Sequence, residues 1–102
     1  MRTNQMSLKI EKKDAQTLTL TGRLDTLTAP ELEAEISLLL PNIESLTLDF
    51  EKLDYISSAG LRVILKTQKV LDKKAGLKLI NVSDSVREVF DITGFSDFLT
   101  IE

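Results

Sequence analysis

The chain has 102 residues, of which 42% are hydrophobic, and its 13 Lys and Arg against 16 Asp and Glu give a formal charge of −3. Because it contains no Cys and no His, it lacks the thiolates and imidazoles that most zinc sites, disulfides and hydrolytic centres need. The acidic balance argues against direct nucleic-acid binding, and no apolar run approaches the roughly 18 residues of a membrane span. We therefore expect one cytoplasmic domain over residues 1–102 that binds a protein or small ligand, with no cofactor, no metal and no membrane insertion.

The first two predicted elements are strands. Apolar and polar residues alternate in SLKIEK, at Leu8 and Ile10, and again in TLTLTG, at Leu18 and Leu20. The polar stretch KKDAQ separates the two runs. This pattern predicts an antiparallel hairpin.

A helix is predicted next, in TAPELEAEISLLL. Thr28 and Glu31 have the spacing of a capping box, Pro30 falls in the first turn, and Pro41 marks the stop. The apolar positions that share one helical face are Leu32, Ile36 and Leu39 or Leu40.

The central part of the chain predicts a strand followed by a second helix. ESLTLDF alternates at Leu46, Leu48 and Phe50, and Asp49 falls at the end of this strand. The helix is expected from about residue 59 to Gly76, with glycine as its C-terminal cap. Its apolar face would contain Leu61, Ile64, Leu65, Leu71 and Ala75.

LKLINV reads as a fourth strand, SDSVREVFDITG as a third helix ending at Gly94, and FLTI as a weak last strand. The order ββαβαβα, with a final β, predicts an α/β layered domain with a mostly parallel mixed sheet and an N-terminal antiparallel hairpin. In such sheets, sites gather outside the carboxyl ends of the strands. GRLDT (22–26) and DYISSAGLRV (54–63) both follow strands toward helices, so they are expected on the same rim.

The segment DYISSAGLRV has a composition suited to an anion at a helix start. If Ser58 is the N-cap or first residue, its hydroxyl lies beside unpaired N–H groups and the positive end of the helix dipole. A phosphate there, with a charge of about −1.5 to −2, would be tolerated by the fold. Gly60 costs roughly 1 kcal/mol relative to alanine in a helix, which suggests a compensating close approach of the backbone. The plainer interpretation is that Ser57 or Ser58 only caps the helix.

YISSAGLRVIL, together with LTGRLDTLTAPEL, LTLDFEKLDYI and NVSDSVREVFDITGF in that order, resembles the STAS family, and specifically the bacterial anti-sigma factor antagonists. The resemblance runs from about Leu8 to Ile101 and implies the family's fold. In that family the phosphorylated serine follows an aspartate and precedes a small residue, a glycine and a leucine.

Matched residue by residue, Ser58 takes the position of the phosphoacceptor, and it is followed by Ala59, Gly60 and Leu61 in the small, glycine and leucine positions. Ser57 departs from the pattern, because it stands where the family has aspartate. This departure puts recognition by a kinase in question, and Ser57 is itself a weaker candidate acceptor.

The resemblance implies a switch without catalysis by this chain. The unphosphorylated antagonist binds an anti-sigma factor, usually also an ATP-dependent serine kinase, and thereby releases a sigma factor. Phosphorylation weakens the binding and a phosphatase restores it. Asp25 and Asp49 match acidic family positions near the acceptor, and Arg62 flanks it. The expected partner-binding residues are Asp25, Asp49, Ser57, Ser58, Ala59, Gly60, Leu61 and Arg62.

Other interpretations stay open at this point. A STAS subunit of a transporter ATPase would bind its partner without phosphorylation. Asp49 would suit a response-regulator-like phosphoacceptor, but such chemistry needs clustered acids around Mg²⁺, and no acidic pair follows the first strand. Asp25 and Asp49 are equally consistent with solvated acids, and Arg62 with an exposed helical residue. No nucleophile has a base beside it in the sequence, so an enzyme is not expected.

Overall fold

The computed structural model describes residues 8–102 of the chain, as five strands, three α-helices and two short 3₁₀ helices. In chain order these elements are β1 (Leu8–Asp14), β2 (Thr17–Leu24), α1 (Ala29–Leu39), η1 (Leu40–Asn42), β3 (Ser45–Ile56), α2 (Ser58–Leu71), β4 (Gly76–Ile80), α3 (Asp84–Thr93), η2 (Phe95–Phe98) and β5 (Thr100–Ile101). The predicted order of strands and helices is therefore confirmed.

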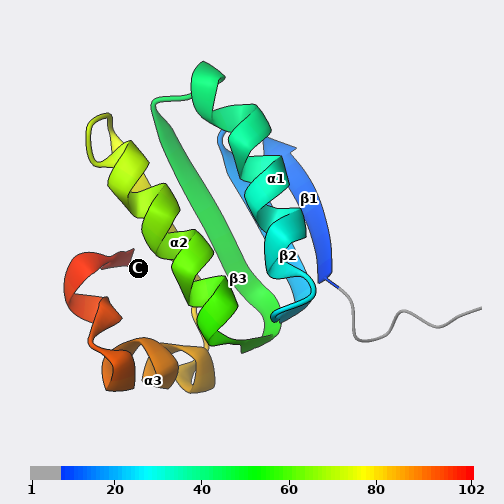
Figure 1. Ribbon diagram of the computed structural model, residues 1–102, viewed down its shortest axis with the longest axis vertical. Coiled ribbons are helices and arrows are strands. Elements are labelled where there is room, and N and C mark those ends of the chain that lie inside the picture. The colour runs from blue at the N-terminus through cyan, green and yellow to red at the C-terminus, as the bar shows by residue number, and fades with distance from the viewer. Residues whose placement is uncertain (1–7) are drawn as a thin grey trace, which may run out of the picture.

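The five strands form one sheet in the order β1-β2-β3-β4-β5. β1 and β2 pair antiparallel, and the other neighbours pair parallel. Since each parallel crossover steps in the same direction, the right-handed rule places the crossover helices on one side of the sheet. Figure 1 shows α1 and α2 side by side over that face. No helix within residues 8–102 lies over the other face, and polar residues lie along it in register, such as Thr17, Thr47 and Lys78.

The core lies between the sheet and the helices. Leu46, Leu48 and Phe50 of β3 are buried together with Leu61 and Ile64 of α2, as the shared periodicities predict. Leu65 is partly buried against the same cluster. α3 closes the remaining end, since the rings of Phe50 and Phe90 stack with their centroids 6.4 Å apart.

The third strand is longer than the sequence predicted. It continues to Ile56, because Leu53 and Ile56 are buried as well. Two irregularities in the pairing of β2 with β3, between Thr19 and Thr21 and between Gly22 and Arg23, break the strict alternation. The prediction that Asp49 ends this strand is therefore wrong.

The second helix is shorter than predicted and ends at Leu71. The amide of Ala75 donates to the carbonyl of Glu44 at 2.7 Å, which draws the chain into the sheet before Gly76. Gly76, at φ 100°, therefore begins β4 instead of capping α2, and Ala75 is exposed instead of facing the sheet. Gly94, by contrast, caps α3 in the left-handed conformation, as predicted.

At the first helix, Pro30 lies in the first turn as expected, and Pro41 lies in η1 just beyond the helix end. Thr28 is the N-cap residue, but its side chain makes no capping hydrogen bond to the helix. The predicted capping box does not form, because the Thr28 hydroxyl is bound to the preceding loop instead.

Candidate functional site

The site is built where β2 and β3 end and α2 begins. Leu24 and Ile56 are opposite one another in the parallel register, and the Ser57 amide donates to the Leu24 carbonyl at 2.9 Å. This bond fixes the start of α2 beside the loop that leads into α1. GRLDT and the SSAGL stretch therefore share one rim, as the strand order predicted.

Ser57 and Ser58 have different surroundings. Ser57 is the N-cap residue, in extended conformation, and its Oγ accepts a hydrogen bond from the Gly60 amide at 3.4 Å. Ser58 is the first residue of the helix and is exposed. Because Ser57 already caps the helix, the Ser58 hydroxyl faces solvent beside the positive end of the helix dipole.

Gly60 packs tightly against the ends of the two strands. A Cβ atom on this residue would lie 2.6 Å from Leu24 Cγ and 3.0 Å from Ile56 Cγ1. The close approach suggested by the sequence is therefore present, and it lets the first turn of α2 sit directly on the strand ends.

Asp25 organises the loop beside Ser58. Its Oδ1 accepts hydrogen bonds from the amides of Leu27, at 3.0 Å, and Thr28, at 3.1 Å, while Oδ2 lies 3.7 Å from Arg23 Nε. Burial raises the pKa of this carboxyl. The backbone hydrogen bonds, the Thr28 hydroxyl and the Arg23 charge together lower it by more, so the pKa lies below the ordinary value. Asp25 is thus the ionised centre of a shaped loop.

Two features of this loop were not found from the sequence. The Leu27 side chain, at the loop tip, is 83% exposed. The Arg23 guanidinium lies over the Tyr55 ring, 4.1 Å from its centroid, and links the loop to the end of β3. Leu27 does have a signal in the sequence, since it is an apolar residue that lies outside the predicted helical face.

A shallow groove of about 260 Å³ lies between the N-terminal parts of α1 and α2. It begins beside Ser58, and its lining includes Ala59 and Arg62 from α2 and Thr26 and Glu33 from the α1 side. Two more residues of the predicted site therefore border a concave surface next to the serine.

Asp49 lies apart from this rim, in the middle of β3. At about 3.3 Å per residue, the strand end at Ile56 is up to roughly 23 Å further on. The Asp49 carboxylate accepts from Asn81 Nδ2 and from the Glu51 amide, both at 3.0 Å. Although burial raises the pKa of Asp49, these hydrogen bonds and the charges of Lys13 and Lys52 hold it below the ordinary value.

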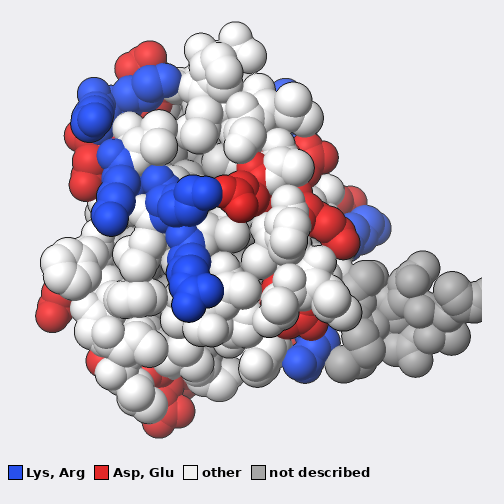
Figure 2. Space-filling model, viewed as in Figure 1, with Lys and Arg blue, Asp and Glu red and all other residues white. Residues whose placement is uncertain are grey.

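The helix that begins at Ser58 carries a basic row. Arg62, Lys66 and Lys69 recur at helical spacing on α2, Lys73 follows just beyond the end of the helix, and all four are exposed. Figure 2 shows Lys and Arg side chains gathered over α2 and acidic side chains toward α1. Lys66 pairs with Glu33 of α1. Although the whole chain is acidic, this face is locally positive.

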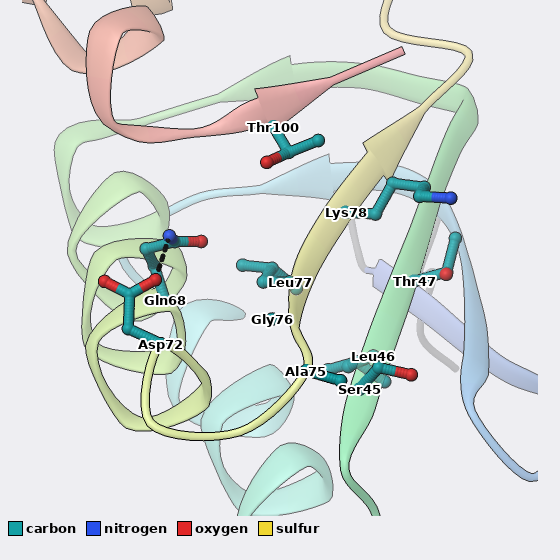
Figure 3. Close-up of a pocket in the computed structure, with 10 residues that line it drawn as sticks. All are labelled: Ser45, Leu46, Thr47, Gln68, Asp72, Ala75, Gly76, Leu77, Lys78 and Thr100. Atoms are coloured by element: carbon teal, nitrogen blue, oxygen red, sulfur yellow. Dashed lines mark hydrogen bonds between the residues drawn. The ribbon is translucent and has the colours of Figure 1, made fainter.

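Figure 3 shows a different hollow, of about 330 Å³, at the opposite end of α2. Gln68 Nε2 donates to Asp72 Oδ1 at 2.7 Å along one wall, and Gly76, Leu77 and Thr100 lie across from them. None of the ten described residues around this hollow belongs to the rim that holds Ser58.

Residues 8–102 lack two further kinds of feature. Within this range, no group of three His, Cys, Asp or Glu side chains is placed to hold a metal ion. No helix in the same range has both the length and the apolar composition that crossing a membrane requires.

The one-sided sheet, the capped helix start and the shaped loop beside it define a small α/β domain with an exposed rim at the strand ends. The chain belongs to the STAS domain family, whose sequence model matches residues 7–102. This confirms the resemblance seen in the sequence.

The similar proteins within the STAS family are anti-sigma factor antagonists by name. The chain is 42% identical to BtrV of Bordetella bronchiseptica, for which anti-sigma factor antagonism is the suggested role, over 88% of this chain and 80% of BtrV. It is 32% identical to the anti-sigma-B factor antagonist of Bacillus subtilis, over 94% of this chain and 88% of that protein. These names describe antagonists of other proteins and not enzymes.

A solved structure of an anti-sigma factor antagonist has the same fold as this chain. The anti-sigma factor antagonist SpoIIAA, in its unphosphorylated form, superposes with a TM-score of 0.73 at 25% identity, covering 93% of this chain and 87% of SpoIIAA. The phosphorylated form of SpoIIAA shares the fold, with a TM-score of 0.68 at 24% identity and coverage of 93% and 90%. The chain is therefore a member of the family of SpoIIAA-like anti-sigma factor antagonists.

Proposed function

We propose that this chain binds an anti-sigma factor in its unmodified form, releases a sigma factor, and is switched off by phosphorylation of Ser58. The observation that carries the proposal is the exposed hydroxyl of Ser58 at the first position of α2, next to a serine that already caps the helix. The similarity to anti-sigma factor antagonists supports the choice of partner.

The modifying reaction is a phosphoryl transfer from ATP, performed by a partner serine kinase. Ser58 Oγ bonds to the γ-phosphorus, the bond from that phosphorus to the ADP oxygen breaks, and the hydroxyl proton passes to a base of the kinase or to solvent. A phosphatase reverses the modification by hydrolysis. The chain itself supplies the acceptor and no catalytic group.

The fold tolerates the phosphate better than an interface does. At the start of α2 the anion meets the positive end of the helix dipole, so the domain keeps its structure. A partner surface formed against a neutral hydroxyl would have to remove water from a charge of about −2, which is costly unless the partner brings cations. Binding is therefore lost without unfolding.

The binding surface extends from the serine to its neighbours. It comprises the N-cap Ser57 and Ser58, Ala59 and Arg62 of α2, with the Asp25 loop and the exposed Leu27 beside them. Gly60 and Leu61, which the sequence also predicted as partner contacts, are buried against the strand ends and the core, so they support this surface from beneath. Asp49, on β3, stays a prediction as a partner contact. In this scheme residues 1–102 act as one cytoplasmic STAS domain.

Labelling with the partner kinase and ATP tests the proposal. The kinase is the one recovered with the chain from native lysate, and mass spectrometry reads the modified residue. The wild type should take up one phosphate and Ser58→Ala none. The matched control is Ser57→Asp, which keeps a capping side chain and restores the residue that the family resemblance places there; it should still be labelled.

Labelling of Ser58→Ala together with loss of labelling in Ser57→Ala would move the acceptor to Ser57. Recovery of a transporter ATPase, with Ser58 unmodified, would favour a transporter subunit instead.

A further inference from the structure

Arg62 lies one helical turn after Ser58 on the exposed side of α2. Side chains four residues apart on a helix are neighbours, with Cβ atoms about 5–6 Å apart. An acidic group that precedes a basic one at this spacing is the favourable order, because it also agrees with the helix dipole. A phosphate on Ser58 would therefore be within reach of the Arg62 guanidinium.

Arg62 has no acidic partner within 4 Å in the described part of the chain, whereas its neighbour Lys66 pairs with Glu33. Asp25, across the rim, is bound by its own loop and by Arg23. Charged residues on the elements that meet at this rim include Arg23 of β2, Asp25 just after it, Glu33 of α1, Asp54 of β3, and Arg62 and Lys66 of α2.

The first turn of α2 carries no acidic residue. Its N-cap is the neutral Ser57, in the position where the family resemblance expects an aspartate. A phosphate on Ser58 would thus meet no carboxylate in the first turn of its own helix, while the next turn offers a cation. Both features favour a local ion pair over a phosphate held only by water.

We propose that Arg62 pairs with the phosphate on Ser58 and holds it against the helix. This inference rests on the proposed modification of Ser58 and deepens it. The planar guanidinium donates two parallel hydrogen bonds to phosphate oxygens, which a lysine cannot do. The modification then acts twice, because it adds negative charge and also withdraws Arg62 from the surface that the unmodified protein presents.

The test uses the 102-residue chain with phosphoserine incorporated at position 58 during translation, so that no kinase or partner is needed. ³¹P NMR follows the second ionisation of the phosphate as the pH is changed. A nearby cation favours the dianion, so Arg62→Gln should raise the phosphate pKa by at least about 0.3 pH units. Arg62→Lys keeps the positive charge but not the planar guanidinium, so its phosphate pKa should lie between those of the parent and Arg62→Gln.

Lys69→Gln is the matched control, since it removes one charge from the same basic row. Lys69 lies about 16 Å further along the helix, beyond the screening length of about 8 Å at physiological salt. Lys69→Gln should therefore leave the phosphate pKa within about 0.1 pH units of that of the parent. The gap between the parent and Arg62→Gln should also shrink in 1 M salt.

The same phosphate pKa in the parent and in Arg62→Gln, or equal shifts in Arg62→Gln and Lys69→Gln, overturns the proposal. Either result leaves the switch at Ser58 intact, because binding of the anti-sigma factor is measured separately. A clear shift with unchanged partner binding would retain the ion pair and reject the switch.

Discussion

Two adjacent serines occupy different positions at the start of α2: Ser57 is the N-cap residue and Ser58 is the first residue of the helix. Ser57 accepts the Gly60 amide and ends the extended segment, so Ser58 is left as an exposed hydroxyl in the first turn. The sequence predicted a serine at this helix start but did not decide between N-cap and first residue. That choice depends on the backbone bond from Ser57 to Leu24, a contact between segments far apart in the chain.

Substitution of Gly60 tests the close approach at this helix start. Alanine would gain up to about 1 kcal/mol in helix propensity. Its Cβ, however, would meet Leu24 Cγ at 2.6 Å, and Leu24 is fully buried. Since overpacking costs about 1–3 kcal/mol, we expect Gly60→Ala to lower the free energy of unfolding by a net value of about 1 kcal/mol in urea denaturation.

A double-mutant cycle with Leu24→Ala identifies the cause. If the clash with Leu24 is responsible, the two substitutions together should cost less than the sum of their separate costs. A stabilised Gly60→Ala protein, or strictly additive costs, would show that the first turn of α2 has room for a methyl group.

Most strands and helices could be predicted from the alternation of apolar residues in strands and from their helical spacing. The leucines of β2 and β3 are buried as their period predicts, and α3 ends at Gly94 as its sequence predicts. The end of α2 could not be predicted from the local pattern, because a bond between Ala75 and Glu44 begins the next strand. The extension of β3 to Ile56 depends on pairing irregularities that interrupt the period of two.

Asp49 connects β3 to the residue after β4 and should make stability depend on pH. Burial raises the pKa of this carboxyl, but the hydrogen bonds from Asn81 and the Glu51 amide, together with the charges of Lys13 and Lys52, lower it by more, so the pKa in the fold is below the ordinary value of 3.8. Such a carboxylate contributes stability above pH 3.8 that is lost as the pH falls toward the folded-state pKa. Asp49→Asn should therefore show a smaller loss of unfolding free energy between pH 6 and pH 3 than the wild type.

Urea denaturation at a series of pH values measures this difference. Asp54→Asn is the matched control, since Asp54 is an exposed acid of the same strand and its substitution removes the same charge. If Asp49→Asn loses as much stability as the wild type over this interval, the hydrogen bonds to Asp49 do not favour its ionised form.

For the whole molecule, the fold explains how a charge can be added without loss of structure. All crossovers step one way, so one face of the sheet carries α1 and α2, and the rim at the strand ends presents Ser58 to solvent (Figure 1). The basic row on α2 lies beside that rim in an otherwise acidic chain (Figure 2). A partner that covers Ser58 therefore also lies next to a positive surface.

The sequence located this rim and the GRLDT loop beside it through the SSAGL match and the strand order, but not the contacts that hold the loop in shape. The three-dimensional roles of Asp25 and Arg23 depend on hydrogen bonds and a stacked tyrosine that no spacing rule contains. Asp49 was placed near the acceptor by family resemblance, whereas the bulged strand carries Ser58 well beyond it.

The central claim is that charge at residue 58 controls association while the fold is kept. Calorimetric titration of the anti-sigma factor, recovered with the wild-type chain, into the unmodified and Ser58-phosphorylated forms tests it most directly. We expect at least about tenfold weaker binding of the phosphorylated form, or roughly 1.4 kcal/mol, with Ser58→Ala binding like the unmodified protein. Circular dichroism should show the same fold in all samples. Equal affinities of two equally folded forms would contradict the switch and leave Ser58 as an exposed residue of the first helical turn.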